Sequence, residues 1–310
     1  MKCIKDRQAR FKALKTTDSN QIRNGTEMTF LYIATGLILL YGILTLIMTY
    51  MVQKFPRRPV RDVPDWGNLK DLVIPSIDGG FLEVWVVEPP SPSRGKVVLA
   101  HGWSRNRDRM VSRARVFARM GFTAVLYSAR DHGGSSPCSL MNAFRFTEDM
   151  ESILKWLNEP VILYGHSLGA VAALTAAAKN RGLVKALFLE GCYAKTKEAL
   201  LSIYRRYNLV FGILFGHAIV FWFDLFTKFR LEQSSPLFLA SRVTIPVLLI
   251  HGEADKTFPL HHAWRLRDGF PGGTAELFVA PGADHSSSSL AKGFPEAIRE
   301  FTDRHFHHKQ

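Results

Sequence analysis

A serine between two glycines is the feature of this chain that could most directly support chemistry. Residues 161–180 read VILYGHSLGAVAALTAAAKN, so an apolar run enters the Gly-x-Ser-x-Gly pattern around Ser167 and an alanine-rich stretch follows. Between a strand and a helix, this pattern forms the nucleophile elbow, a tight turn that exposes the serine hydroxyl above a helix N-terminus. The bare pattern arises by chance in about one chain in ten of this length, so its meaning depends on the partners of Ser167.

A serine hydroxyl needs a base to become a nucleophile, and the base needs an acid that orients it. Asp255 lies in IPVLLIHGEADKTFP (245–259), in the loop after an apolar run, and His285 lies in AELFVAPGADHS (275–286), after the next one. The order Ser, Asp, His is the order that follows a nucleophile elbow. Because the carboxyl ends of parallel strands meet at one edge of a sheet, the sequence predicts that these three side chains lie together.

Several other acids and histidines stand close enough along the chain to compete for these roles. A turn aspartate after a strand is common, so other acids compete with Asp255. Among the histidines, only His285 combines a position after the last strand with a preceding loop acid. The competing acids and histidines are Glu190, Glu253, Asp284, His251, His261 and His262.

The elements that would position these residues alternate in type from about residue 69. Short apolar runs such as KVVLAHG, FTAVLYSAR, VILYG, KALFLEG, PVLLIHG and AELFVA predict buried strands, and helical segments separate several of them. One such segment, TEDMESILKWLNEP, predicts a helix with Thr147 as its N-cap. This alternation indicates an α/β fold, with a mostly parallel sheet sandwiched by helices. A hairpin with its turn at 78–80 predicts an antiparallel edge.

Residues 193 to about 240 break the alternation with an aromatic-rich run, YNLVFGILFGHAIVFWFDLFTKF. We expect a helical cap insertion over the active site, and a cap of this composition could also rest in the bilayer interface. A second transmembrane helix is the alternative. It would place residues 240–310 across the membrane from Ser167 and so separate the candidate catalytic residues.

An uncharged stretch, residues 29–52, predicts an N-terminal transmembrane helix because it exceeds the roughly 20 residues that cross a bilayer. A buried core helix is usually shorter and amphipathic, and a cleaved signal peptide fits poorly because no small-residue cleavage site follows. The predicted organisation is therefore a basic arm (1–28), this membrane anchor, a proline-containing linker (53–68) and one domain (69–310).

The formal net charge of +13 bears on the partners of the chain. The sequence has no zinc-finger spacing and no RNP signature, so we expect a membrane bilayer as the partner and no nucleic acid. Basic residues are in excess before the apolar stretch, which predicts a single-pass protein with its catalytic domain on the non-cytoplasmic side. The basic residues of 105–119, at helical spacing, predict a solvated helix face, with membrane-surface contact as the alternative. Three cysteines without a CxxC argue against a disulfide framework or a zinc site.

Five short motifs together resemble the α/β-hydrolase family of serine hydrolases. They are HGW (101–103), SARDHGGSS (128–136), GHSLG (165–169), HGEADKTFP (251–259) and GADHS (282–286). Within that family the chain is most similar to membrane-anchored serine hydrolases that act on acyl esters and thioesters. SARDHGGSS departs slightly from the family pattern, and the resemblance implies that this loop braces the elbow.

The resemblance implies a role for each residue. Ser167 attacks the substrate carbonyl, His285 takes and returns the proton, and Asp255 holds His285 in the right tautomer. The backbone N–H groups of Trp103 and Leu168 form the oxyanion hole. The expected substrate is a small-molecule or lipid acyl ester or thioester, and no cofactor or metal is implied. A serine peptidase, an acyltransferase and a non-catalytic binding protein on the same fold are the alternatives.

Overall fold

The computed structural model describes residues 2–306, without the side chains of residues 1–25 and of Asp78. It divides into two units, Met1–Met51 and Val52–Gln310. The first unit is one helix, α1 (Lys2–Met51), so the residues predicted as a basic arm continue the helix of the predicted anchor, while most of the arm's side chains lie outside the description. Within α1, Thr26–Met51 is the only helix among the described residues that is long and apolar enough to cross a membrane.

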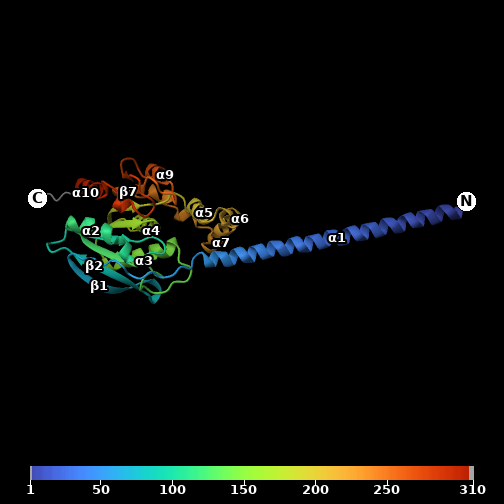
Figure 1. Ribbon diagram of the computed structural model, residues 1–310, viewed down its shortest axis with the longest axis horizontal. Helices are drawn as coiled ribbons and strands as arrows, with labels where there is room; N and C mark the ends of the chain where they lie inside the picture. The colour runs from blue at the N-terminus through green and yellow to red at the C-terminus, as the bar shows by residue number, and fades with distance from the viewer. Residues whose placement is uncertain (1, 307–310) are drawn as a thin grey trace. The chain divides into compact units, whose positions relative to one another are not determined.

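An eight-stranded sheet is the frame of the second unit (Figure 1), in the order β1-β2-β4-β3-β5-β6-β7-β8. β1 and β2 form an antiparallel hairpin, β2 is also antiparallel to β4, and every other pair is parallel. The prediction of a mostly parallel sheet with an antiparallel edge is therefore confirmed. The strands are β1 (Asn68–Pro75), β2 (Phe81–Glu88), β3 (Lys96–Ala100), β4 (Thr123–Tyr127), β5 (Val161–His166), β6 (Val184–Glu190), β7 (Val247–Gly252) and β8 (Ala275–Ala280).

Helices cover both faces of this sheet. Along β3, Val98 and Ala100 belong to one buried cluster and Val97 and Leu99 to another, as expected for a strand that is packed on both sides. The first cluster includes residues of α3 and α4, and the second includes residues of α2 and α10. These helices are α2 (Val111–Arg119), α3 (Ala143–Leu157), α4 (Leu168–Lys179) and α10 (Phe294–His305), and α9 (His261–Gly269) lies between β7 and β8 in the chain.

The start of α3 differs from the prediction. Asn142 is its N-cap, and the side chain accepts hydrogen bonds from the N–H groups of Phe144 and Arg145. Thr147 lies inside the helix, where its hydroxyl donates to the carbonyl of Ala143. The Thr147 cap is therefore wrong. Asparagine and threonine both make good caps, and the earlier one prevails because the turn it adds carries a buried phenylalanine into the core.

A helical insertion connects β6 to β7, in the region where the sequence predicts a cap. The aromatic run is divided between α6 (Leu209–Leu214) and α7 (Gly216–Phe226), so within the described part of the chain it contains no helix of transmembrane length. The alternative of a second transmembrane helix is therefore wrong. In Figure 1 these helices lie at one end of the second unit. The remaining helices of the insertion are α5 (Thr196–Tyr207), η3 (Glu232–Ser234) and α8 (Pro236–Ala240).

The basic residues of 105–119 do not form one solvated face. They divide between η2 (Arg107–Met110) and α2, and two of their arginines are buried. Arg107 makes two hydrogen bonds to the carboxylate of Asp71, at 2.7 and 3.1 Å, and its guanidinium stacks on Trp85. Arg113 is 1% exposed and pairs with a buried glutamate of β6. The prediction of a solvated face is wrong for these two arginines, because each is buried and forms an ion pair with a carboxylate on a distant strand.

Candidate active site

Ser167 occupies the turn between β5 and α4, with φ 55° and ψ −117°. A non-glycine residue at this φ is strained, so the surrounding packing must hold it there. The two flanking glycines allow that packing. A Cβ on Gly165 would lie 2.3 Å from the carbonyl oxygen of Gly169, and one on Gly169 would lie 2.4 Å from the carbonyl oxygen of Ala100. Strand and helix can approach this closely only because both positions lack a side chain.

The structure brings Ser167, His285 and Asp255 together, although they follow three different strands. His285 Nε2 lies 3.0 Å from Ser167 Oγ, and His285 Nδ1 lies 2.7 Å from Asp255 Oδ2. Ser167 is partly exposed and the His285 side chain is 18% exposed, so both are in contact with solvent. These distances are within the reach of a nucleophile, a base and an orienting acid.

Asp255 is fixed by several donors. Its Oδ1 accepts hydrogen bonds from the N–H groups of Thr257 and Phe258, at 2.8 and 2.9 Å. Burial alone would raise its pKa, but the hydrogen bond and charge of His285 and the N–H of Phe258 outweigh burial and lower the pKa. Asp255 is therefore an anion at neutral pH. An anion there favours the His285 tautomer with the proton on Nδ1, which leaves Nε2 free to accept the proton of Ser167.

The two backbone N–H groups predicted for the oxyanion hole come from the loop after β3, which carries Trp103, and from the start of α4, at Leu168. Within the part of the chain that the structure describes, neither the Trp103 nor the Leu168 N–H donates to a protein acceptor. Leu168 is the first residue of α4, where helix N–H groups have no intrahelical partner. Trp103 follows Gly102, at which an added Cβ would lie 3.0 Å from the Cβ of Ser167. The loop that carries Trp103 thus lies directly against the serine.

Two buried histidines support that loop. The Ala129 N–H donates to His101 Nε2 at 3.0 Å, which leaves His101 Nδ1 as the donor to the carbonyl of Gly102. His132 acts in the same way, since its Nε2 accepts from the Ser104 N–H at 3.1 Å. Burial lowers the pKa of His132 to about 4, so it is neutral and can accept this bond. The resemblance predicted that residues 128–136 brace the elbow, whereas His132 of that loop is hydrogen-bonded to the Trp103 loop.

Glu190 lies next to the elbow, but it does not contact His285 through its carboxylate. Arg113 donates two hydrogen bonds to that carboxylate, at 2.6 and 2.9 Å, and the Tyr164 hydroxyl donates a third at 2.7 Å. Burial alone would raise the pKa of Glu190, but the charge of Arg113 outweighs it and lowers the pKa to about 2. The Glu190 carbonyl accepts from the Ser167 N–H at 2.8 Å. Glu190 is therefore a support of the elbow.

The other competing residues have local partners of their own. His251 Nε2 lies 2.7 Å from the carbonyl oxygen of Phe258 and 3.5 Å from Asp255 Oδ2. Glu253 accepts from the N–H of Gly282, and Asp284 accepts from the Ser286 N–H and the Ser287 hydroxyl. Within the part of the chain that the structure describes, the hydrogen-bond partners of the His285 ring are Asp255 and Ser167, and these competing residues are not among them.

A second group of side chains has the composition of a metal site. The ligand atoms of Glu198, His261 and His262 lie within 4.8 Å of one another. However, Arg265 donates two hydrogen bonds to the Glu198 carboxylate, at 2.9 and 3.0 Å. The Ala194 N–H donates to His262 Nδ1, which keeps the proton on Nε2. A protonated nitrogen cannot bind a metal, so the group is better described as an ion-pair network.

The arginines of η2 and α2 are functional supports that sequence reasoning missed. The side chains of Arg109 and Arg113 both donate to the carbonyl of Ser286, the residue after His285. They thus connect the loop that carries His285, after β8, to elements that lie far earlier in the chain, before β4. The only signal in the sequence was the spacing of basic residues, and a solvated helix has the same signal.

Comparison with known proteins agrees with this architecture. A family model described as the alpha/beta hydrolase family matches residues 97–300. A monoacylglycerol lipase of Mycolicibacterium smegmatis is 25% identical over 239 residues, covering 66% of this chain and 84% of that protein. The Saccharomyces cerevisiae membrane protein YNL320W is 22% identical over 253 residues, covering 77% and 82%. The Pyrococcus furiosus esterase Pf2001 superposes with a TM-score of 0.62 at 15% identity, covering 80% of this chain and all of that one. By its sequence and its fold, this chain belongs to the alpha/beta hydrolase family.

Proposed function

We propose that the protein is a serine hydrolase that cleaves carboxylic ester or thioester bonds of apolar acyl substrates. The observation that carries the proposal is the continuous contact from Ser167 Oγ to His285 Nε2, at 3.0 Å, and from His285 Nδ1 to Asp255 Oδ2, at 2.7 Å. A serine, a histidine and a buried carboxylate in this order are the components of acyl transfer through an acyl-enzyme.

In the proposed reaction, Ser167 Oγ forms a bond to the substrate carbonyl carbon while its proton moves to His285 Nε2. The carbonyl oxygen becomes an oxyanion and accepts hydrogen bonds from the Trp103 and Leu168 N–H groups, each worth about 3 kcal/mol in the transition state. When the tetrahedral intermediate collapses, the bond to the leaving oxygen or sulfur breaks and His285 protonates that atom. Water then attacks the acyl-enzyme by the same route and regenerates the Ser167 hydroxyl.

Two observations support an apolar, lipid-like acyl group. The cap exposes large apolar side chains on α6 and α7, among them Leu209, Val210, Ile213 and Phe221. A relative with a similar sequence is a monoacylglycerol lipase. A small-molecule or lipid ester that partitions into the bilayer fits both observations.

The proposed membrane association rests on the apolar helix and on the relatedness to a membrane protein of yeast. In this proposal, residues 1–28 are a basic arm, 29–52 a single-pass anchor and 53–68 the connection to the catalytic domain. That domain is 69–310, with the cap at about 193–240. The excess of basic residues before the anchor favours the non-cytoplasmic side for this domain.

Labelling of membrane fractions with a fluorophosphonate probe tests the proposed function. Wild type should be labelled and Ser167→Ala should not, because only an activated serine reacts with the probe. Ser91→Ala, which changes an exposed loop serine, is the matched control and should be labelled like wild type. Absence of label on wild type, or its persistence on Ser167→Ala, overturns the proposal. An ester and an amide of one acyl group, followed by an acyl-chain series, distinguish an esterase from a peptidase.

A further inference from the structure

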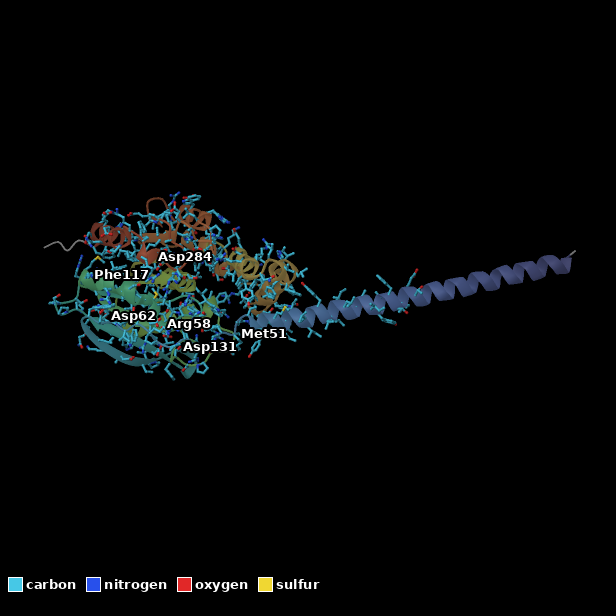
Figure 2. The ribbon with its side chains drawn as sticks, in the orientation of Figure 1. Met51, Arg58, Asp62, Phe117, Asp131 and Asp284 are labelled. Carbon is cyan, nitrogen blue, oxygen red and sulfur yellow. The ribbon has the colours of Figure 1, made fainter. Side chains whose placement is uncertain are left out.

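The segment between α1 and β1 contains neither helix nor strand, yet it is hydrogen-bonded to the rest of the second unit. We call residues 55–61 the strap. Asn106 Nδ2 donates to the carbonyls of Arg58 and Pro59, at 2.9 and 3.3 Å, and the Arg61 N–H donates to Asp108 Oδ2 at 2.8 Å. Figure 2 labels Arg58 and Asp62 within the outline of the second unit. The strap is therefore hydrogen-bonded to Asn106 and Asp108, which lie just after Trp103 in the chain.

Phe55, at the start of the strap, packs on that loop. Its ring centroid lies 4.9 Å from that of Trp103, in an edge-on arrangement, and 4.5 Å from that of His132. The rings of Trp103 and His132 also contact Phe146, at 6.3 and 5.2 Å. Aromatic pairs at these separations attract one another. Phe55 is the member of this cluster that comes from outside residues 97–300, the part that matches the family model.

Arg57 connects the strap to the second loop of the site. Its guanidinium donates to the carbonyls of Gly133 and Ser135, at 3.1 and 2.7 Å, and lies 3.6 Å from Asp131 Oδ1. This loop carries His132, which accepts the Ser104 N–H. The strap thus contacts the loop that carries Trp103 and the loop that carries His132. The hydrogen bond from the Ser104 N–H to His132 joins these two loops and fixes the backbone next to Trp103.

The backbone beside Trp103 is in a conformation that needs such support. Ser104 has φ 57°, a left-handed value that is unfavourable for a residue with a side chain. Its N–H bond to His132 and the aromatic packing on Trp103 hold the loop in this conformation. Both of these contacts involve a ring that Phe55 touches.

We infer that Phe55 and Arg57 are positioning residues for the oxyanion hole, and that the strap keeps the Trp103 N–H aimed at the developing oxyanion. The inference rests on the proposed function, because it concerns a donor to the transition state. A donor of this kind contributes mainly when the oxyanion forms, so its displacement lowers kcat and leaves KM largely unchanged. In the chain, residues 52–54 separate the strap from the end of α1.

The test uses the full chain in detergent micelles with a short, soluble ester. Phe55→Ala should lower kcat about tenfold with KM within about twofold, because complete loss of one oxyanion donor costs about a hundredfold or more. The affinity for a trifluoromethyl ketone, whose adduct places an oxyanion in the hole, should fall by the same factor as kcat/KM. Phe55→Trp should restore most of kcat and of the ketone affinity. Trp156→Ala, which removes an aromatic side chain from the surface of α3, should change neither of these two quantities.

Arg57→Gln provides a second variant if Phe55→Ala does not fold, and we expect a smaller loss in the same direction. Wild-type values of kcat and of ketone affinity in both folded variants would overturn the inference and leave the proposed function intact. A rise in KM alone would also overturn it, because it would assign the strap to substrate binding. An inactive wild type would instead reject the proposed function itself.

Discussion

At the scale of single residues, the candidate site depends on side chains and backbone groups held in strained or desolvated states. Ser167 keeps a positive φ because its N–H is bound to the Glu190 carbonyl and because its neighbouring glycines let α4 pack closely. Asp255 stays ionised although it is only 4% exposed, because three donors surround it. A residue whose pKa and geometry are controlled in this way is typical of a catalytic site.

Asp255→Asn should separate orientation from folding. An amide offers Nδ1 of His285 no anionic acceptor, so the tautomer that can accept the Ser167 proton is disfavoured and kcat should fall on the order of 10⁴-fold. The measurement is steady-state hydrolysis of a soluble ester together with the rate of fluorophosphonate labelling. Glu253→Gln, which changes the acid that accepts from the Gly282 N–H, should keep kcat within about twofold of wild type. Equal losses in the two variants would contradict the role of Asp255.

At the scale of elements, α2 connects the elbow to the His285 loop through one buried arginine. Arg113 binds the carboxylate of Glu190 on β6 and reaches the carbonyl of Ser286, and both members of the Arg113–Glu190 pair are nearly fully buried. The charge of Glu190 raises the pKa of Arg113 against the effect of burial, and Arg113 lowers that of Glu190. The two shifts agree in direction, so each charge stabilises the other.

Arg113→Met should therefore destabilise the fold strongly, because it leaves Glu190 buried without its counter-charge. Removal of one partner of a buried ion pair typically lowers the free energy of unfolding by about 3–5 kcal/mol. Chemical denaturation in detergent measures the loss. Arg119→Met, which changes an exposed arginine at the end of the same helix, should be nearly neutral. The double variant Arg113→Met with Glu190→Gln should recover part of the stability, and a loss equal to the sum of the single losses would contradict the pairing.

The elements also show which features a sequence pattern can predict. The buried strands and the type of sheet could be predicted from short apolar runs, since a strand that is buried on both faces has few polar residues. The start of α3 was misplaced because Asn142 and Thr147 are both acceptable caps by type. The basic helix was misinterpreted for a related reason. The spacing of Arg107 and Arg113 does not reveal that carboxylates on β1 and β6 lie opposite them.

At the scale of the whole molecule, buried neutral histidines make the fold sensitive to acid. Burial lowers the pKa of His132 and His262 to about 4 and that of His166 to about 3, against an ordinary value of 6.5. Between about pH 6.5 and pH 4 the unfolded chain binds protons that the folded chain excludes. The free energy of unfolding that these neutral histidines contribute is therefore complete above pH 6.5, and it is lost as the pH falls toward 4.

The thermal midpoint should fall as the pH is lowered from 7 to 4.5. Each such histidine contributes up to about 1.4 kcal/mol per pH unit within the window. His262→Asn should make the decline shallower, because an asparagine oxygen can still accept the Ala194 N–H without binding a proton. Ser91→Ala, which changes an exposed loop serine, should leave the pH dependence of the thermal midpoint like that of wild type. Parallel pH curves for wild type and His262→Asn would contradict this account.

By itself, the sequence determined the local features of this protein. The apolar span, the strand, turn and helix around Ser167, and the loops that carry Asp255 and His285 can be predicted because each depends on residues close together in the chain. The tertiary structure alone decided what supports them. Arg113 pairs with Glu190 across 77 positions, and Arg57 reaches Ser135 across 78, so these contacts depend on how distant elements pack. Hydrophobic periodicity specifies which face of an element is buried, whereas the partner of a buried charge or ring is fixed only when the elements meet.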